Sequence, residues 1–196
     1  MKFSKTKMMS KYFSEYEVFH SETAQKEGIV NYPTNDLASM YRIKNTLKVM
    51  DKIREGFGEP IVVTSFFRHF LLNDAVGGSP TSQHVIGEAV DFRVSRNSKR
   101  DNLDLLMYIK ENHDFHQLIN EFPNENGIPS WIHLGVKMND RDNRNQVLLA
   151  QKNDKGLTEF VDITDGLKKK SKKSKTPIFT LGIVIIGIIA YIVAKN

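Results

Sequence analysis

The sequence contains no cysteine, so neither a disulfide bond nor a thiolate metal ligand can form in this chain. Histidine, aspartate and glutamate are therefore the side chains that can hold a metal ion tightly. Residues 1–12 are basic but lack a continuous apolar stretch, and we expect no secretory signal peptide there. The absence of cysteine leaves the redox compartment undetermined.

The sequence has no excess of positive charge outside the C-terminal tail. The formal net charge of the chain is +5, but residues 168–196 hold seven lysines and no acidic residue. Removing those seven charges leaves −2 for the rest of the chain, which is close to neutral. The sequence therefore predicts no nucleic-acid-binding surface on the folded part.

A long hydrophobic run occurs near the C-terminus. The segment 178–194 contains seventeen residues without a charge and is rich in isoleucine and valine, and six lysines lie within 168–175. This composition predicts a single transmembrane helix at 176–195 that anchors the protein in a lipid bilayer. The lysines before it place the preceding domain on the cytoplasmic side by the positive-inside rule.

His84 and Asp91 lie seven positions apart, with Gly87 between them. Residues 88–94 alternate in hydrophobicity, so the sequence predicts a strand in which Asp91 faces away from the apolar side chains. A carboxylate in the middle of a strand is costly to bury without a partner. A divalent metal ion is one such partner, and His84 is the nearest candidate for a second ligand.

His133 offers a third ligand. It lies in a second strand-like run, 130–136, on the same face as Trp131 and Gly135. Two histidines and one carboxylate, with one position left for water, form a typical catalytic zinc set. The spacing alone leaves alternatives open, because an isolated histidine is more often a core or surface residue and an aspartate near a turn is often a cap.

The remaining pattern predicts an α+β fold with a small, mainly antiparallel sheet flanked by helices. Ser14 and Glu17 have the spacing of a capping box, and Thr34 or Asn35 is expected to cap a long helix that ends near Gly58. Apolar residues at three- and four-residue intervals predict that helix, and a second helix is expected at 102–112. Strands are expected at 61–65, 88–94, 115–122, 130–136 and 147–150.

The sequence divides into four regions. We expect a basic N-terminal segment at 1–12, a domain at 13–150, a polar and then lysine-rich linker at 151–175, and the transmembrane helix at 176–195. The length allows one core-forming domain with appendages.

Six stretches resemble, in order, the motifs of one enzyme family. They lie within residues 13–136, about two thirds of the chain, and are FSEYEVFHSETA (13–24), GIVNYP (28–33), GEPIVVTSFFR (58–68), LNDAVGGSPTSQH (72–84), GEAVD (87–91) and WIH (131–133). The region is similar to the catalytic domain of the zinc D-Ala-D-Ala carboxypeptidase family, a branch of the M15 peptidases. Its fold is shared with Hedgehog signalling domains and lysostaphin-type enzymes, and the small phage and bacterial branch is most similar.

The resemblance implies that His84, Asp91 and His133 bind zinc. It also implies that Glu121 acts as general base and acid, taking a proton from the attacking water and passing it to the leaving nitrogen. Glu125, in the loop that follows, is the alternative base.

Two further positions match the substrate-binding residues of that family. Arg68 matches an arginine that stabilises the developing oxyanion or anchors a substrate carboxylate, and Ser82 matches a cleft position. The sequence departs from the family pattern at three places. Phe66 replaces the usual glycine, His116 stands where aspartate is common, and the loop 122–130 is longer than usual.

The resemblance therefore implies a membrane-anchored, zinc-dependent peptidase that hydrolyses peptidoglycan peptides, as an endolysin-like DD-carboxypeptidase or endopeptidase. A cytoplasmic domain faces away from peptidoglycan, so the expected orientation leaves open how the enzyme reaches this substrate. A non-catalytic zinc-containing binding or structural module tethered to the membrane is the alternative, and a lipid-surface protein that functions through its tail is a third. The bond cleaved, the host and the oligomeric state do not follow from the sequence.

Overall fold

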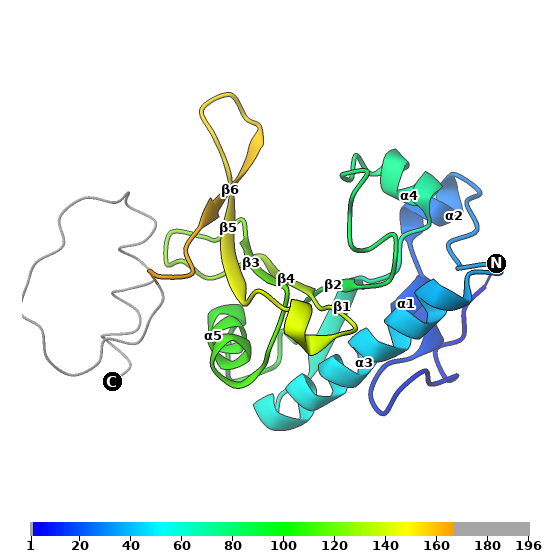
Figure 1. Ribbon diagram of the computed structural model, residues 1–196, viewed down its shortest axis with the longest axis horizontal. Helices are drawn as coiled ribbons and strands as arrows, with labels where there is room; N and C mark the ends of the chain where they lie inside the picture. The colour runs from blue at the N-terminus through cyan, green and yellow to red at the C-terminus, as the bar shows by residue number, and fades with distance from the viewer. Residues whose placement is uncertain (1, 167–196) are drawn as a thin grey trace, which may run out of the picture.

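The structure is a computed structural model that describes residues 2–166, and within this range helices pack on a mixed six-stranded sheet (Figure 1). The spatial order of these strands is β1-β2-β4-β3-β5-β6. β3 and β5 run parallel, and the other neighbouring strands are antiparallel, so the predicted α+β class is confirmed. The bounds are β1 (Ile61–Ser65), β2 (Ala89–Val94), β3 (Gln117–Glu121), β4 (Trp131–Gly135), β5 (Gln146–Lys152) and β6 (Thr158–Asp162).

The helices of the described region are mostly short, and α3 is the long one. Their bounds are α1 (Glu15–Phe19), α2 (Glu22–Lys26), α3 (Leu37–Phe57), α4 (Phe70–Ala75), α5 (Asn102–Asn112) and the 3₁₀ turn η1 (Asp140–Asp142). The capping box of Ser14 and Glu17 at α1 is confirmed, and so is the end of α3 at Gly58. A capping box and a glycine at a helix end each depend on only a few neighbouring residues, so the sequence alone is enough to predict them.

The predicted cap of α3 was wrong by one or two residues. The cap is Asp36, whose side chain accepts a hydrogen bond from the backbone N–H of Ser39 at 2.9 Å, and not Thr34 or Asn35. Asn35 has a left-handed backbone with φ of 59°, whereas a capping residue needs an extended or similar conformation with negative φ.

α3 and α5 cover one face of the sheet, and the main hydrophobic core lies between these helices and the sheet (Figure 1). Val90 and Phe92 of β2 point into this core and are fully buried. Asp91 lies between them in sequence and therefore points to the opposite face. The alternation predicted for residues 88–94 is confirmed, and it separates the apolar face from the face that carries the candidate site.

The N-terminal segment packs against the domain. The ring centroids of Phe3 and Phe19 lie 5.4 Å apart, and the Ser10 hydroxyl donates to the Asp51 carboxylate of α3 at 2.9 Å. Its basic side chains also form ion pairs, Lys7 with Glu15 at 2.6 Å and Lys11 with Glu55 at 2.8 Å.

The segment after residue 150, predicted as a linker, forms part of the sheet. β5 extends to Lys152, and β6 pairs with it antiparallel, with Ala150 opposite Phe160 and Leu148 opposite Asp162. The sequence of β6 is half polar because an edge strand exposes one face and one side to water. The boundary expected at residue 150 therefore falls inside a strand.

The lysine-rich segment at 168–175 and the transmembrane helix predicted at 176–195 both lie outside the described residues. Within residues 2–166, no helix has both the length and the apolar character needed to cross a bilayer.

Candidate metal centre

The antiparallel register of β2 and β4 places Asp91 directly opposite His133. On the other side of β4, Ile119 of β3 lies opposite His133. Directly opposed residues project from the same face of a sheet, with Cβ atoms about 4.5–5.5 Å apart. The pairing therefore puts a carboxylate and an imidazole side by side on the face that α3 and α5 leave uncovered.

His84 reaches this face from the loop that precedes β2. Gly87 turns the chain between His84 and the strand with a φ of 78°. A Cβ atom at this position would lie 2.6 Å from Ile43 and 3.0 Å from the backbone oxygen of Ser39, both in α3. Only glycine lets the loop pack this closely on the helix while adopting a positive φ.

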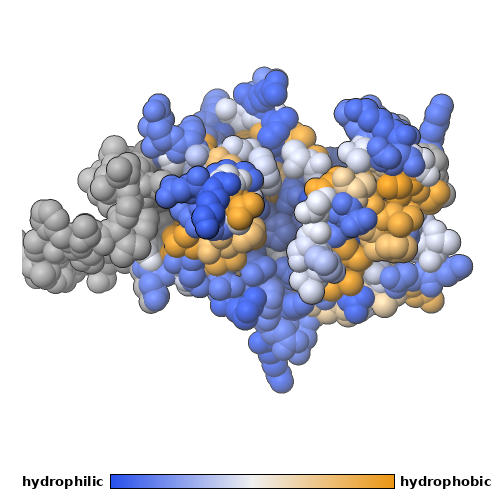
Figure 2. All heavy atoms as spheres, turned by 90° about the horizontal axis from the view of Figure 1, so that it is seen from above, coloured by the Kyte–Doolittle hydropathy of each residue, from blue (hydrophilic) through white to orange (hydrophobic). Residues whose placement is uncertain are grey.

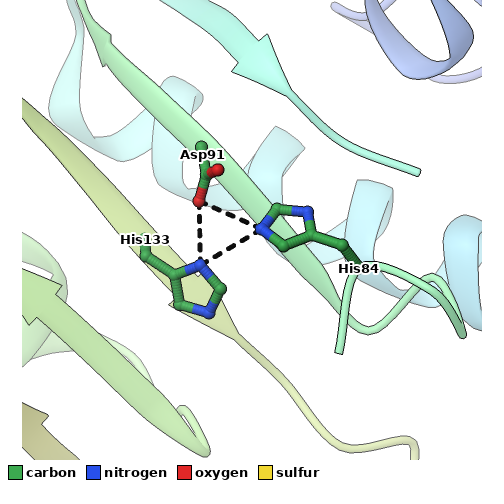
Figure 3. Close-up of side chains that lie close together, drawn as sticks. All are labelled: His84, Asp91 and His133. Carbon is green, nitrogen blue, oxygen red and sulfur yellow. Dashed lines mark hydrogen bonds and ion pairs between the residues drawn. The ribbon is translucent and has the colours of Figure 1, made fainter. Parts of the chain in front are cut away.

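The donor atoms of His84, Asp91 and His133 converge on one point (Figure 3). His84 Nε2 lies 3.1 Å from Asp91 Oδ1 and 3.2 Å from His133 Nδ1, and the latter two atoms are 2.8 Å apart. Ligands at zinc–ligand distances of about 2.0–2.1 Å in a tetrahedron lie about 3.3 Å from one another. The triangle thus has nearly the size of one face of a zinc coordination tetrahedron.

The protonation of His84 also fits a metal ligand. Its Nδ1 lies 2.6 Å from the carbonyl oxygen of Phe66, which can only accept, so Nδ1 carries the proton. Burial lowers the pKa of the His84 imidazole, and the nearby Asp91 carboxylate offsets this only in part. The neutral ring therefore directs the Nε2 lone pair at a carboxylate oxygen, an arrangement that a cation between them stabilises.

Asp91 remains ionised in this site. Burial alone would raise the pKa of the Asp91 carboxyl, but the His133 imidazole, whose Nδ1 lies 2.8 Å from Oδ1, helps to hold that pKa well below its usual range. Arg68 Nη2 donates to Asp91 Oδ2 at 2.6 Å, and Arg68 Nε donates to the Ser65 hydroxyl at 2.8 Å. Arg68 therefore fixes the second carboxylate oxygen, and Oδ1 is left to face the two imidazoles.

Glu121 lies at the end of β3, on the same face as His133. The residue opposite Glu121 on β4 is Trp131, so Glu121 is diagonal to His133. Cα atoms of diagonal neighbours in a sheet are about 7–8 Å apart. Burial raises the pKa of Glu121 to about 7, while His133 lowers it and Asp91 raises it further. Glu121 is thus a carboxyl group near the three donors, outside their triangle, with a pKa suited to proton transfer near neutral pH.

The other two candidate residues lie at the edges of this region. Ser82 is partly buried in a turn before His84, where its backbone N–H donates to the Ser79 carbonyl at 3.0 Å. Glu125 is exposed in the loop between β3 and β4. The fold brings Arg68 into contact with Asp91, places Glu121 diagonal to His133 and leaves Glu125 at a loop tip.

Two groups that support the site were not predicted. The carbonyl of Phe66 orients His84, and the hydroxyl of Ser65 orients Arg68. A backbone carbonyl carries no sequence signal, since every residue has one. Ser65 has a weak signal, because it precedes Arg68 by three residues at the end of a predicted strand, where a turn can bring the two side chains together.

The fold and the three converging donors define an α+β domain with a site suited to a divalent metal beside a carboxyl group of raised pKa. The family model described as Peptidase M15 matches residues 11–134, a range that includes Arg68, Glu121 and the three donors. The chain belongs to the peptidase M15 family, so the resemblance inferred from the motifs is confirmed and the protein is assigned to the hydrolases. No curated protein matches the chain.

Proposed function

We propose that this protein is a zinc-dependent peptidase that hydrolyses peptidoglycan peptides, as an endolysin-like DD-carboxypeptidase or endopeptidase. Family membership supports the peptidase class, and the donor set of two imidazoles and one carboxylate supports zinc. The observation that carries the proposal is the position of Glu121, diagonal to His133 with a pKa raised to about 7. A site that only stores zinc has no need for such a carboxyl group.

His84, Asp91 and His133 would hold the zinc ion, which supplies a Lewis acid that polarises the scissile carbonyl and acidifies water when it is bound. The Glu121 carboxylate takes a proton from the attacking water. The same carboxyl group then passes that proton to the nitrogen of the leaving amine. A pKa near 7 suits both steps, because the group exchanges a proton readily in each direction at neutral pH.

Arg68 has a double role in this proposal. Two of its N–H groups hold Asp91 and Ser65, and a guanidinium has five N–H donors in total. The others are available to the substrate carbonyl as negative charge develops on its oxygen, or to a substrate carboxylate. The Ser82 hydroxyl, two residues before His84, is proposed to contact the peptide.

We also propose that residues 176–195 anchor the enzyme in a bilayer, with the lysines at 168–175 on the cytoplasmic side. The anchor would hold the peptidase at the membrane surface. Access to peptidoglycan would then depend on a breach of the membrane or on another route of export.

The test uses the full chain, purified in detergent and loaded with zinc, together with purified peptidoglycan. New amino and carboxyl ends are identified by mass spectrometry, and bound zinc is measured on the same samples. We expect cleavage by the native chain, a loss of about 10²–10⁴-fold in rate for Glu121→Gln with zinc retained, and little change for Glu125→Gln. Zinc binding without cleavage of several peptidoglycan types would reject the peptidase and favour a zinc-containing binding module.

A further inference from the structure

His84 is the candidate metal ligand that no strand pairing positions. Asp91 and His133 lie on β2 and β4, whose register fixes their spacing. His84 lies in residues 82–88, the loop that leads into β2. The site face opens into a hollow between the β5–β6 hairpin and the part of the molecule that carries α4 (Figure 2). The loop therefore takes its support from the elements below and beside it, which include α3 and β4.

The first contact between this loop and β4 is made without a hydrogen bond. The Gln83 side chain lies over Gly135, the last residue of β4, where an added Cβ atom would overlap Gln83 Oε1. Both polar atoms of the Gln83 amide are buried, and neither has a hydrogen-bond partner among residues 2–166. This contact supplies packing but no directional bond that would fix the loop.

The second contact is made by Glu88, at the other end of the loop. Its backbone N–H donates to the Gln83 carbonyl, and its own carbonyl accepts from the Val136 N–H, both at 2.9 Å. Its carboxylate is held from two sides, by Lys137 Nζ at 2.7 Å and by Arg42 Nε at 3.4 Å. Glu88 is only 7% exposed, so its charge needs these partners. We refer to Arg42, Glu88 and Lys137 as the ionic clamp.

The ionic clamp lies close to all three metal-binding candidates along the chain. Glu88 follows His84 by four residues and precedes Asp91 by three, and Lys137 follows His133 by four. The ion pair of Glu88 with Lys137 thus joins the chain segment that enters β2 to the segment that leaves β4. A change in the length of this ion pair would move the His84 loop relative to His133.

α3 gives the ionic clamp a fixed support. This helix has 21 residues and packs in the main core. The Thr46 hydroxyl of α3 donates to the Gly87 carbonyl at 2.9 Å, and the Asn45 amide of α3 donates to the Lys137 carbonyl at 3.4 Å. The Lys137 backbone N–H also donates to the Asn143 side chain at 3.0 Å. Lys137 is therefore held by its backbone, and its ammonium group draws Glu88 toward a fixed position.

We propose that Glu88 is a positioning residue of the metal site, and that its ion pairs with Lys137 and Arg42 set the separation of the His84 and His133 imidazoles. The inference rests on the zinc site of the proposed function and names the contacts that hold its geometry. His84 Nε2 and His133 Nδ1 are 3.2 Å apart, close to the spacing of about 3.3 Å that tetrahedral zinc requires. Zinc–ligand distances vary by only about 0.2 Å between good sites, so a small shift of the loop weakens binding.

The experiment uses the full chain, purified in detergent and freed of metal with a chelator. Zinc affinity is measured by competition with a chromophoric chelator. Cobalt(II) is then bound in place of zinc, because its visible absorption spectrum reports the geometry of the ligands. Glu88→Gln keeps the size of the side chain and removes its charge. We expect it to lower zinc affinity about tenfold, with one ion still bound per chain, and to change the cobalt spectrum.

Lys137 tests the same contact from the other side. Lys137→Met is expected to lower zinc affinity roughly threefold, a smaller loss because Arg42 still pairs with Glu88. Lys137→Arg keeps the charge and is expected to retain most of the native affinity. The double variant Glu88→Gln with Lys137→Met is expected to bind zinc about as well as Glu88→Gln alone, because both substitutions remove one shared contact.

Glu55→Gln is the matched control. Glu55 also forms an ion pair from α3, with Lys11 at 2.8 Å, but this pair joins the helix to the N-terminal segment. It is expected to leave the zinc affinity and the cobalt spectrum unchanged. Thermal melts in chelator give the range in which each variant is folded, and zinc is titrated within that range. A loss of stability alone then leaves the affinity unchanged.

The outcomes separate positioning from structural support. If Glu88→Gln melts earlier but keeps the native zinc affinity and cobalt spectrum, the proposal is rejected. It is also rejected if the double variant loses the product of the two single losses, or if Glu55→Gln weakens zinc binding as much as Glu88→Gln does. If Glu88→Gln does not fold in chelator, Lys137→Met and Lys137→Arg decide by the same criteria.

The same samples distinguish this proposal from the peptidase function. If the native chain binds zinc, weakly so in the clamp variants, but cleaves no peptidoglycan, the peptidase is rejected and the positioning role of Glu88 stands. If it cleaves peptidoglycan and the clamp variants bind zinc as the native chain does, the positioning role is rejected and the peptidase stands. A native chain that binds no zinc would reject both.

Discussion

The two faces of the sheet are built from the same strands but contribute differently to the protein. On β2, Phe92 points into the core and is fully buried among apolar side chains, whereas Asp91 points to the uncovered face and contacts His84, His133 and Arg68. Apolar burial stabilises the first face without specific geometry. A buried charge on the second face needs a defined partner, and this division lets the chain hold the candidate metal site without weakening its core.

The same face also holds two carboxyl groups with opposite behaviour. The pKa of Asp91 lies well below its usual range beside His133, while burial raises the pKa of Glu121 to about 7. Pairs of acidic groups whose environments separate their pKa values commonly divide the chemical roles of a site. Asp91 is suited to remain a charged ligand, and Glu121 is suited to exchange a proton.

The largest expected effect comes from Asp91→Asn on the site face. The substitution removes the ionised ligand and leaves Arg68 without its charged partner. We expect zinc affinity to fall by more than the roughly 10–100-fold that follows loss of a supporting contact, and cleavage to be lost with it. Zinc titration by calorimetry measures the affinity. Asp162→Asn on β6 is the control, and equal zinc affinity in both variants would contradict the assignment.

The matched change on the core face is Phe92→Ala, one residue further along β2. Phe92 is fully buried, so its truncation leaves a cavity in the main core. We expect the free energy of unfolding to fall by about 3–5 kcal/mol. Urea denaturation of the zinc-free protein provides the measurement. A variant that keeps its stability but loses zinc affinity would show that the two faces are not separate in function.

Arg68→Ala gives a smaller effect on the site face. Arg68 holds Oδ2 of Asp91, so its loss frees the carboxylate to rotate away from the imidazoles. Zinc affinity is expected to fall about 10–100-fold, as is typical for a residue that orients a ligand. Arg93→Ala is the control, because Arg93 lies on the same strand and its guanidinium donates to the Val94 carbonyl instead. If both substitutions weaken zinc binding equally, the orienting role of Arg68 is wrong.

The sequence predicts much of this site because its signals are local. The alternation around Asp91 and the run around His133 define the two strands, and the motifs place His84 before them. Pairing these strands in antiparallel register is enough to bring Asp91 and His133 together. The long helix and its end at Gly58 follow from apolar spacing and a glycine in the same way.

Other features required the tertiary structure. The choice between Glu121 and Glu125 depends on where β3 ends and how the following loop leaves the sheet. The contact between Arg68 and Asp91 joins the loop after β1 to β2, and nothing in either sequence neighbourhood indicates it. β6 was missed because it is a half-exposed edge strand with only Phe160 and Val161 as large apolar residues, so its sequence resembles a polar linker.

The smallest expected effect is a pH dependence of stability that distinguishes Glu121 from the exposed Glu125. In the metal-free folded protein the pKa of Glu121 is raised to about 7 from a usual value near 4.5. A carboxyl group with a raised pKa favours the folded state below its unfolded pKa, and this contribution is lost as the pH rises through the folded pKa. The native protein should therefore lose stability relative to Glu121→Gln between about pH 4.5 and pH 7.

The measurement is a series of thermal melts in chelator, with each variant compared with the native chain across this pH range. We expect the melting temperature of Glu121→Gln to exceed that of the native chain by a few degrees above pH 7, and the difference to shrink toward pH 4.5. Glu125→Gln is the control, and its melting temperature should stay close to that of the native chain because the side chain is exposed in a loop. A constant difference for Glu121→Gln would mean that Glu121 is not desolvated on this face, and its proposed role as proton carrier would lose its physical basis.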